Sequence, residues 1–468
     1  MKNGGIYMFK FIEPKIQLDK KRQIFTNKHL RALIIPLIIE QLLILLVGIA
    51  DTLMVSYAGE AAVSGVSLVN QLNTVFILVF TALASGGAVV ASQYIGNKNK
   101  ENGVLAASQL VMITTIISVI LLVLSVIFRE QLLTLLFGKV APDVMDACLK
   151  YLVISAFSFP ALAIYNSCAG LFRSMSKTNV IMYVSIIMNI INIIGNAIGI
   201  FILHAGVAGV AYPSLISRVV AALILLIISF NQKNIIYIRI KDIFKWNAQM
   251  IKRILNIAIP NGIENGLFQL SKVALSSIVA MFGTSQIAAN GVAQSFWSMA
   301  ALFCIAMGPA FITVIGQCMG AGDKEAADYY MKKLLRITYI GGIIWNIVFF
   351  LFTPIILKLY SLSNETIKLI IILCFIHNLF NALLCPILCP IASSLSNGLR
   401  AAGDVKYTMY TSIFSTVVCR VILSFIFGVW MNLGVIGIAL AMVGDWAIKS
   451  ALILVRYLQG QWKSFKVI

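Results

Sequence analysis

Long, almost uninterrupted apolar runs occur throughout this chain, and they set the strongest limit on its fold. Crossing the hydrocarbon of a bilayer takes roughly 20 apolar residues per helix. A backbone in lipid must hydrogen-bond internally, and these runs are too long and too unalternating for barrel strands, so they predict helices. The twelve expected spans are 31–56, 64–95, 103–127, 148–171, 179–203, 207–230, 251–281, 287–318, 333–356, 367–395, 407–430 and 434–456.

Composition excludes several other classes of protein. Apolar residues make up 60% of the 468 residues and charged residues 11%, whereas soluble domains carry about 25% charged residues. This excludes a soluble enzyme, a disordered protein and a disulfide scaffold, and it leaves no room for a sizeable soluble domain. The chain has no Walker A, GxSxG or HExxH motif, so we expect no ATP hydrolysis, no enzymatic activity and no cofactor.

The basic residues indicate how the chain is oriented. There are 36 Lys and Arg against 17 Asp and Glu, a net charge of +19. They lie in an arm before the first span and in alternate short loops, which the positive-inside rule places in the cytoplasm. They form no groove with interleaved aromatic residues, so nucleic acid is not an expected partner. We expect a multi-pass protein of the plasma (inner) membrane with both termini in the cytoplasm.

The sequence also repeats itself. Because matching Pro, Glu and Arg in one register is rarer than matching apolar residues, the repeat indicates two six-helix halves. Six is an even number, so both halves enter the membrane from the same side, as in the parallel repeats of some transporters. Ungapped shifts of 224 and 227 residues align Pro36 with Pro260, Glu40 with Glu264, and Arg173 with Arg400.

This repeat predicts the domain organisation. We expect an all-α integral membrane protein in which twelve transmembrane helices form two pseudo-symmetric six-helix bundles. The expected parts are a basic cytoplasmic arm (1–30), an N-lobe (31–230), a cytoplasmic linker (231–250), a C-lobe (251–456) and a cytoplasmic tail (457–468).

Four carboxylates fall inside the apolar spans: Glu40, Asp51, Glu264 and Asp445. A charge at mid-bilayer costs at least a few kcal/mol, so each should face the protein interior and is a functional candidate. Glu40 precedes Asp51 by eleven residues, which places both on one helix face about 16 Å apart. Asp445 can meet Arg420 of the preceding helix, which favours a neutralised structural pair.

Two asparagines add a second kind of polar group. Asn192 and Asn196 are four residues apart, so they share one face of the span 179–203. Amide oxygens beside a carboxylate suit a hard cation such as Na⁺, and they equally suit a protonated carboxyl, which needs an acceptor. Packing between helices without any ion explains the same pattern.

Several longer motifs run in a fixed order and recur in the second half. They are PLIIEQLLILLVGIADTLMVSYAGEAAVSGVSL, ASQYIGNKNKE with its copy GQCMGAGDKEAA, IPNGIENGLFQLSK, and NGLRAAGDVKYTM. With these motifs the chain resembles the multidrug and toxic compound extrusion (MATE) family over nearly its whole length. The resemblance implies a V-shaped pair of six-helix bundles that exports organic cations, dyes, antibiotics or metabolites in exchange for Na⁺ or H⁺.

The resemblance also implies an ion-coupling site in the N-lobe. Asp51 matches the first-helix aspartate that binds the coupling ion, and Asn192 matches the fifth-helix asparagine. Asn196 stands where some relatives have aspartate and Ser214 where they have threonine, so this site has one carboxylate in place of two. Na⁺ is the expected metal ion at Asp51, Asn192 and Asn196.

A second candidate site, for substrate or protons, is implied in both halves. Glu264 falls in the seventh-helix region where some relatives carry a functional glutamate, Gln269 is its alternative equivalent, and Glu40 is its counterpart in the repeat. The tenth helix lacks the acidic residue that some relatives use.

The expected function is secondary active export of amphipathic organic cations or drugs by a monomer in lipid, driven by inward Na⁺ or H⁺ movement through alternating access. The alternative is a lipid-linked oligosaccharide flippase of the same superfamily.

Overall fold

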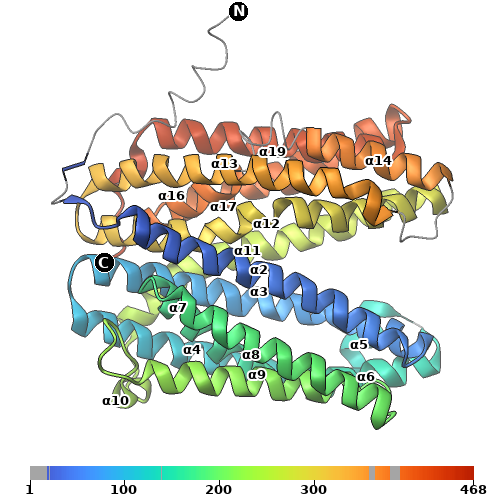
Figure 1. The fold of residues 1–468 in the computed structure, drawn as a ribbon, viewed down its shortest axis with the longest axis horizontal. Coiled ribbons are helices and arrows are strands. Elements are labelled where there is room, and N and C mark those ends of the chain that lie inside the picture. Colours follow the sequence, from blue (N-terminus) through green and yellow to red (C-terminus); the bar gives the residue numbers. More distant parts are fainter. Residues whose placement is uncertain (1–17, 20–21, 139, 358–363, 380–389) are drawn as a thin grey trace, which may run out of the picture. The chain divides into compact units, whose positions relative to one another are not determined.

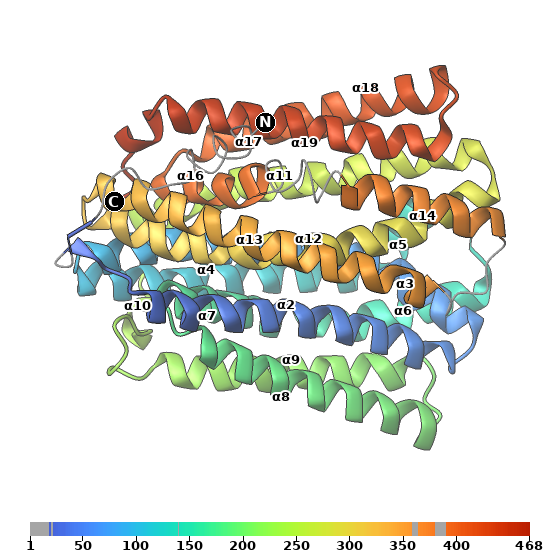
Figure 2. The ribbon, with the colours of Figure 1, turned by 45° about the horizontal axis from the view of Figure 1, so that its top comes forward.

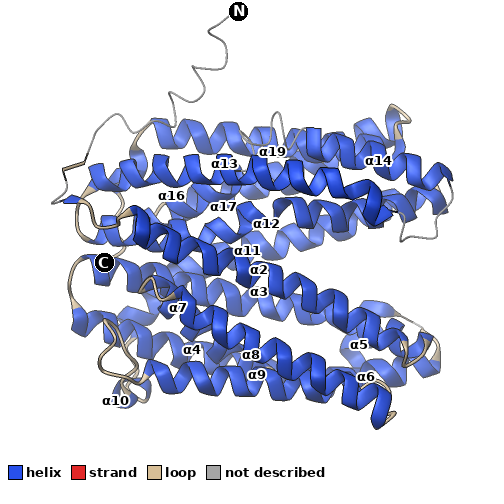
Figure 3. Ribbon diagram, in the orientation of Figure 1, coloured by secondary structure: helices blue, strands red, loops and turns tan. Residues whose placement is uncertain are grey.

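The computed structural model describes residues 18–19, 22–138, 140–357, 364–379 and 390–468. Within these ranges the chain forms helices joined by turns and contains no strand (Figure 3). Ten of the described helices are long and apolar enough to cross a membrane, and a bent pair supplies an eleventh crossing. The predicted all-α membrane fold is confirmed.

The chain divides into two compact units. The N-terminal unit is Asn27–Gly262, and the C-terminal unit is Ile263–Val467 together with Met1–Thr26. The expected limits of the arm, lobes, linker and tail stay predictions.

The N-terminal unit is built from consecutive membrane helices and a short linker helix. It contains α2 (Asn27–Ser56), α3 (Glu60–Gly96), α4 (Lys100–Ile127), α5 (Arg129–Phe137), α6 (Pro142–Phe157), α7 (Phe159–Ser174), α8 (Thr178–Ala197), η2 (Ile198–Ile202), α9 (Ala208–Ser229), α10 (Ile240–Ile243) and the first part of α11 (Ala248–Val279). In this unit α3 packs against α4, α6 and α7, while α8 contacts both α2 and α9 (Figure 1).

The expected span 148–171 is two helices in the structure. α6 and α7 meet at Ser158 and are bent by 46° relative to each other. Pro160 lies in the first turn of α7, where its missing N–H interrupts no helical hydrogen bond and where it starts a new helix readily. The bend places the Ser158 hydroxyl in the buried interior of the unit.

A close approach between two glycines sets the spacing of α8 and α9. A Cβ atom on Gly199 of η2 would lie 2.2 Å from the carbonyl oxygen of Gly209, and one on Gly209 would lie 2.7 Å from the oxygen of Gly199. Neither position has room for a side chain. The two helices therefore come close enough for short polar side chains to meet between them.

The C-terminal unit holds the remaining elements. They are the rest of α11, η3 (Ala280–Phe282), α12 (Thr284–Gly320), α13 (Lys324–Leu357), α14 (Asn364–Leu379), η5 (Pro390–Leu395), α16 (Ser396–Ala402), α17 (Val405–Ile413), η6 (Phe414–Cys419), α18 (Arg420–Ser424), η7 (Phe425–Trp430), α19 (Gly434–Leu458) and η8 (Gln461–Ser464). Figure 2 shows the same elements from a second direction. The middle of the expected span 367–395, residues 380–389, lies outside the described residues.

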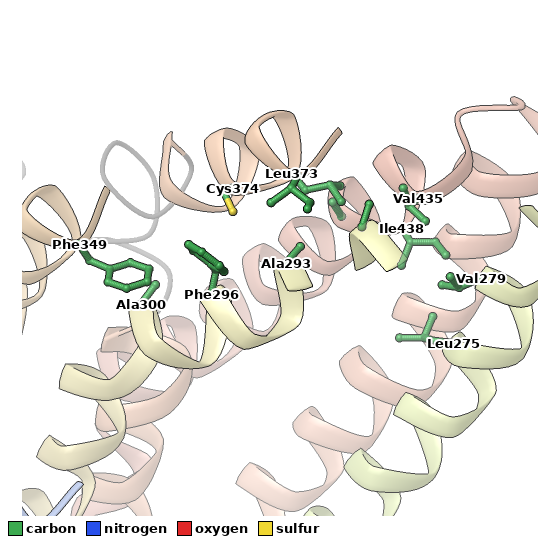
Figure 4. Packing of buried hydrophobic residues seen from close by; sticks show 13 residues of the cluster. Leu275, Val279, Ala293, Phe296, Ala300, Phe349, Leu373, Cys374, Val435 and Ile438 are labelled. Carbon is green, nitrogen blue, oxygen red and sulfur yellow. The ribbon is translucent and has the colours of Figure 1, made fainter. Parts of the chain in front are cut away.

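Apolar side chains hold one end of this unit together. Phe296 of α12 and Phe349 of α13 pack with ring centroids 5.6 Å apart, and Leu373 of α14 joins them (Figure 4). Val435 of α19 and Leu275 of α11 belong to the same buried cluster. The cluster ties α11, α12, α13, α14 and α19 into one bundle.

One crossing of the C-terminal unit is interrupted by wider turns. The span Val405–Trp430 alternates α17, η6, α18 and η7, and both η6 and η7 are π-helical. Such π segments inside α-helices occur frequently at functional sites. Arg420 is the first residue of α18, between the two π segments.

Candidate functional site

Four of the residues expected to couple an ion are joined by hydrogen bonds in the N-terminal unit. Nδ2 of Asn196 donates to Oδ1 of Asp51 at 2.7 Å and to Oδ1 of Asn192 at 3.3 Å. Nδ2 of Asn192 in turn donates to Oγ of Ser214 at 3.0 Å. The structure therefore connects α2, α8 and α9 through a continuous polar chain, hereafter the Asp51 chain.

The asparagines of the Asp51 chain are buried, Asp51 itself is half-buried, and the chain retains an unused acceptor. Asn192 and Asn196 are 5% and 0% exposed. Oδ1 of Asn196 is buried and has no hydrogen-bond partner among the described residues. An orphaned buried oxygen costs free energy unless a ligand or proton satisfies it. A cation held by Asp51 and a proton on Asp51 are both suitable partners for this oxygen, so the donor set fits either ion.

The sequence analysis missed a cation beside this chain. Arg218 lies four residues after Ser214 on α9, hence on the same helix face. Its Nη1 donates to Oγ of Ser158 at 2.8 Å, and its charge interacts electrostatically with Asp51. The i, i+4 spacing of Ser214 and Arg218 was the available signal. Among the described residues, no group of three His, Cys, Asp or Glu side chains that could hold a metal ion is found.

Glu40 makes a different contact from Asp51. Its Oε1 accepts from Nη2 of Arg173 on α7 at 2.5 Å, and Glu40 is 3% exposed. Glu40 and Asp51 share a face of α2, but Glu40 is bonded to Arg173 and does not belong to the Asp51 chain. A buried carboxylate with a bonded guanidinium is internally neutralised, which is a common structural arrangement.

Glu264 repeats this arrangement in the C-terminal unit. Arg400 donates to its Oε2, and Nζ of Lys449 lies 3.3 Å from its Oε1. The repeat aligns Glu40 with Glu264 and Arg173 with Arg400, so it relates the two ion pairs to each other. Neither alignment by itself indicates which residues are paired. Gln269 is half-buried on the same helix, and no hydrogen bond of its side chain is found among the described residues. Glu40 and Glu264 are therefore each paired with an arginine of their own unit.

Arg420 and Asp445 are paired inside the C-terminal unit. Nε and Nη2 of Arg420 donate to the two carboxylate oxygens of Asp445 at 2.7 and 3.2 Å. Both residues are 2% exposed. This fork geometry is the strong bidentate form of an Arg–carboxylate contact.

Comparison with known proteins matches both halves of the chain to one family. The MatE family model matches residues 36–198 and again residues 260–426. The chain belongs to the MatE family. The two matched segments follow the repeat seen in the sequence, and the resemblance to MATE transporters is confirmed.

Relatives and solved structures agree over nearly the full length. The chain is 27% identical to the uncharacterized transporter YisQ of Bacillus subtilis, covering 91% of this chain and 93% of that protein. It is 25% identical to the probable multidrug resistance protein NorM of Thermotoga maritima, covering 98% and 97%.

Among solved structures, a crystal structure of MATE in the bent conformation superposes with a TM-score of 0.82 at 21% identity, covering 93% of this chain and 94% of that one. A MOP superfamily transporter from Pyrococcus furiosus gives a TM-score of 0.86 at 20% identity, covering 96% and 100%. These two structures establish the shared fold. The family is one of transporters, and this MatE chain is a multi-pass membrane protein.

Proposed function

We propose that this MatE protein is a secondary active exporter of amphipathic organic cations and drugs, coupled to inward movement of Na⁺ or H⁺ by alternating access. The relatives named as multidrug resistance proteins support the substrate class. The observation that carries the coupling is the hydrogen-bonded Asp51 chain, which joins three helices of one unit around a carboxylate and an unused amide oxygen.

In this proposal Asp51 is the residue that takes the ion. With Asp51 ionised, its Oδ1 accepts from Asn196. Na⁺ entering from outside is held by the Asp51 carboxylate with the oxygens of Asn192, Asn196 and Ser214, whereas a proton neutralises Asp51. Either event changes the contact between α2 and α8 and so favours one arrangement of the N-terminal unit.

Export requires that ion and drug favour different conformations. An ion shifts an equilibrium only by its difference in affinity for the two states. The loaded Asp51 chain therefore disfavours the outward, drug-bound state, and the drug leaves as the ion binds. Because this linkage is reciprocal, bound drug weakens ion binding by the same factor.

The remaining expectations complete the proposal. In the proposal, the protein works as a monomer in the plasma membrane with both termini in the cytoplasm, and the basic loops support this orientation. Energy comes from the ion gradient, so neither ATP nor a cofactor takes part. Glu40, Glu264 and Gln269 serve as substrate or proton sites, and Arg420 with Asp445 serves as a structural pair.

The test is transport by the purified full chain in liposomes. Uptake of a fluorescent organic cation into these liposomes is followed under an imposed Na⁺ gradient and, separately, under a pH gradient. Wild type is compared with Asp51→Asn and with the matched control Asp143→Asn, which changes an exposed carboxylate at the start of α6.

We expect one gradient to drive transport in wild type and in Asp143→Asn, with Asp51→Asn inactive. Full activity in Asp51→Asn would move the coupling site to Glu40 or Glu264. Absence of cation transport under both gradients would contradict the proposed function and make lipid-linked oligosaccharides the next substrate to test.

A further inference from the structure

Two positively charged side chains lie over one aromatic ring in the C-terminal unit, and a carboxylate is bonded to one of them. Lys272 of α11 places its Nζ 4.9 Å from the centroid of Phe268, and Arg420 of α18 places its Cζ 5.3 Å from the same centroid. Asp445 of α19 is the third charge, bonded to Arg420. Two positive charges and one negative charge leave this group with a net charge of +1.

In the described part of the chain, Lys272 has no carboxylate beside it. The described residues contain no hydrogen bond or salt bridge of its ammonium group, which is half-buried. The nearest acidic residue on its own helix, Glu264, lies eight residues earlier and is engaged by Arg400 and Lys449. A lysine this deep in a membrane helix is costly without a counter-charge.

Arg420 has a donor left over. Nε and Nη2 are used by Asp445, and Nη1 makes no hydrogen bond among the described residues although the side chain is only 3% exposed. Lys272 and Arg420 also interact electrostatically with each other. Two like charges in a low-dielectric interior repel each other. An anion bound by both offsets this repulsion and accepts hydrogen bonds from the unused donors.

The repeat shows that Lys272 has no charged equivalent in the other unit. A shift of 224 residues relates Lys272 to Gly48 (48 + 224 = 272) and Asp51 to Leu275 (51 + 224 = 275). The N-terminal unit therefore has a carboxylate on its first helix where the C-terminal unit has leucine, and the C-terminal unit has a cation where the N-terminal unit has glycine. The two halves have opposite charge at corresponding depths of the first helix.

We propose that Lys272, Phe268 and Nη1 of Arg420 form a binding site for an anionic group, carboxylate or phosphate, carried on an apolar body. Lys272 supplies a positive charge, Arg420 a donor held by its bonds to Asp445, and Phe268 an apolar surface that both cations contact. An amphipathic solute and an anionic lipid headgroup share this chemistry. The site lies within the C-terminal unit and does not rest on ion coupling at Asp51.

The test is equilibrium binding to the full chain in phosphatidylcholine nanodiscs. The probe is 1-naphthoate, compared with neutral 1-naphthamide and with 1-naphthylmethylammonium, which carry the same rings with no charge and with a positive charge. The variants are Lys272→Gln, Lys272→Arg and the control Lys333→Gln, which removes another lysine stacked on an aromatic ring, 5.4 Å from the centroid of Tyr329.

We expect 1-naphthoate to bind wild type, Lys272→Arg and Lys333→Gln comparably and to bind Lys272→Gln about tenfold more weakly, the scale of one hydrogen bond to a charged group. Binding of the amide and the ammonium probe should not depend on residue 272. A second set of nanodiscs containing phosphatidylglycerol distinguishes the source of the anion. Loss of 1-naphthoate binding to wild type in these discs assigns the site to a lipid headgroup, and retained binding assigns it to a solute.

Equal 1-naphthoate binding by wild type and Lys272→Gln in phosphatidylcholine, or equal binding of 1-naphthoate and 1-naphthamide by wild type, would overturn the proposal. Thermal unfolding of each variant in the same discs verifies that it is folded, and Lys272→Arg keeps the test decisive if the glutamine variant is not. Cation transport by the same purified proteins in liposomes reports separately on the proposed function, so failure of one leaves the other standing.

Discussion

Nδ2 of Asn196 donates to the Asp51 carboxylate at 2.7 Å, and this bond joins α8 to α2 within the N-terminal unit. Ionised Asp51 accepts a hydrogen bond from the Asn196 amide. A proton or cation bound at Asp51 competes with this amide for the carboxylate oxygens. The same amide also donates to Asn192. In the proposed mechanism, a change at Asp51 is passed along α8 toward Ser214 through two further hydrogen bonds.

Removing the Asn196 amide should impair ion coupling. Because a hydrogen bond to a charged group contributes about 1.5–3 kcal/mol, Asn196→Ala should raise the half-maximal concentration of the coupling ion about tenfold or more. The measurement is transport against ion concentration in liposomes. Asn189→Ala is the control, since Asn189 is buried two turns earlier on α8 and its Nδ2 has no hydrogen bond among the described residues. Equal effects of the two substitutions would contradict a specific role for Asn196.

The glycine contact between η2 and α9 should be required for the Asp51 chain to form. Gly209→Ala places a Cβ atom 2.7 Å from backbone of Gly199, so the helices must separate and the 3.0 Å bond between Asn192 and Ser214 must lengthen. We expect lower thermal stability and lower transport. Gly48→Ala is the control on α2, because a Cβ there meets nothing within 4 Å. A Gly209→Ala protein as stable and active as Gly48→Ala would show that this spacing does not matter.

The Glu40–Arg173 ion pair should contribute strongly to stability through its burial. Arg173→Met leaves the Glu40 carboxylate, 4% exposed, without its bonded cation, which typically costs about 3–5 kcal/mol. Thermal unfolding in detergent measures this loss. The double variant Glu40→Gln with Arg173→Met should recover much of it, since no charge is left buried. Lys150→Met breaks an exposed pair, 62% and 61% exposed, and should have almost no effect. A double variant no more stable than Arg173→Met would argue against this reading.

The segment before α2 should undock at low pH. Arg22 donates two hydrogen bonds to Asp323, in the turn before α13, and holds the pKa of that carboxyl below its ordinary value of 3.8. Because the pKa is lowered in the folded state, the contact is fully present above pH 3.8 and is lost as the pH falls through the folded-state pKa. The reporter is the Phe25 amide, which donates to the Tyr330 hydroxyl at 2.9 Å.

Hydrogen exchange at Phe25, corrected for the intrinsic pH dependence, should be slow from pH 7 to pH 5 and fast below that pKa. Asp323→Asn should make it fast throughout, while the amide of Thr338 in the middle of α13 stays protected. Unchanged protection of Phe25 in acid or in Asp323→Asn would show that apolar packing alone holds the segment.

Much of the membrane architecture follows from the sequence because lipid leaves the backbone few choices. Runs near the length of a bilayer must be helices, and the repeat of Glu40 at Glu264 already implies two related halves. The break at Ser158 was harder to predict, since a proline inside an apolar run is compatible with a bent helix as well as with two helices. The candidate residues Asp51, Asn192 and Asn196 were recognisable because polar groups are expensive in lipid.

Which polar groups meet was decided only by the tertiary structure. Helical spacing places Asn192 and Asn196 on one face, but it does not say that Asp51 of α2 and Ser214 of α9 lie against that face. The partners Arg173, Arg400 and Arg218 come from helices distant in sequence, and periodicity carries no information on contacts between helices. The sequence by itself determined the spans and the buried polar residues through the cost of transfer into lipid, whereas helix packing chose the partner of each charge.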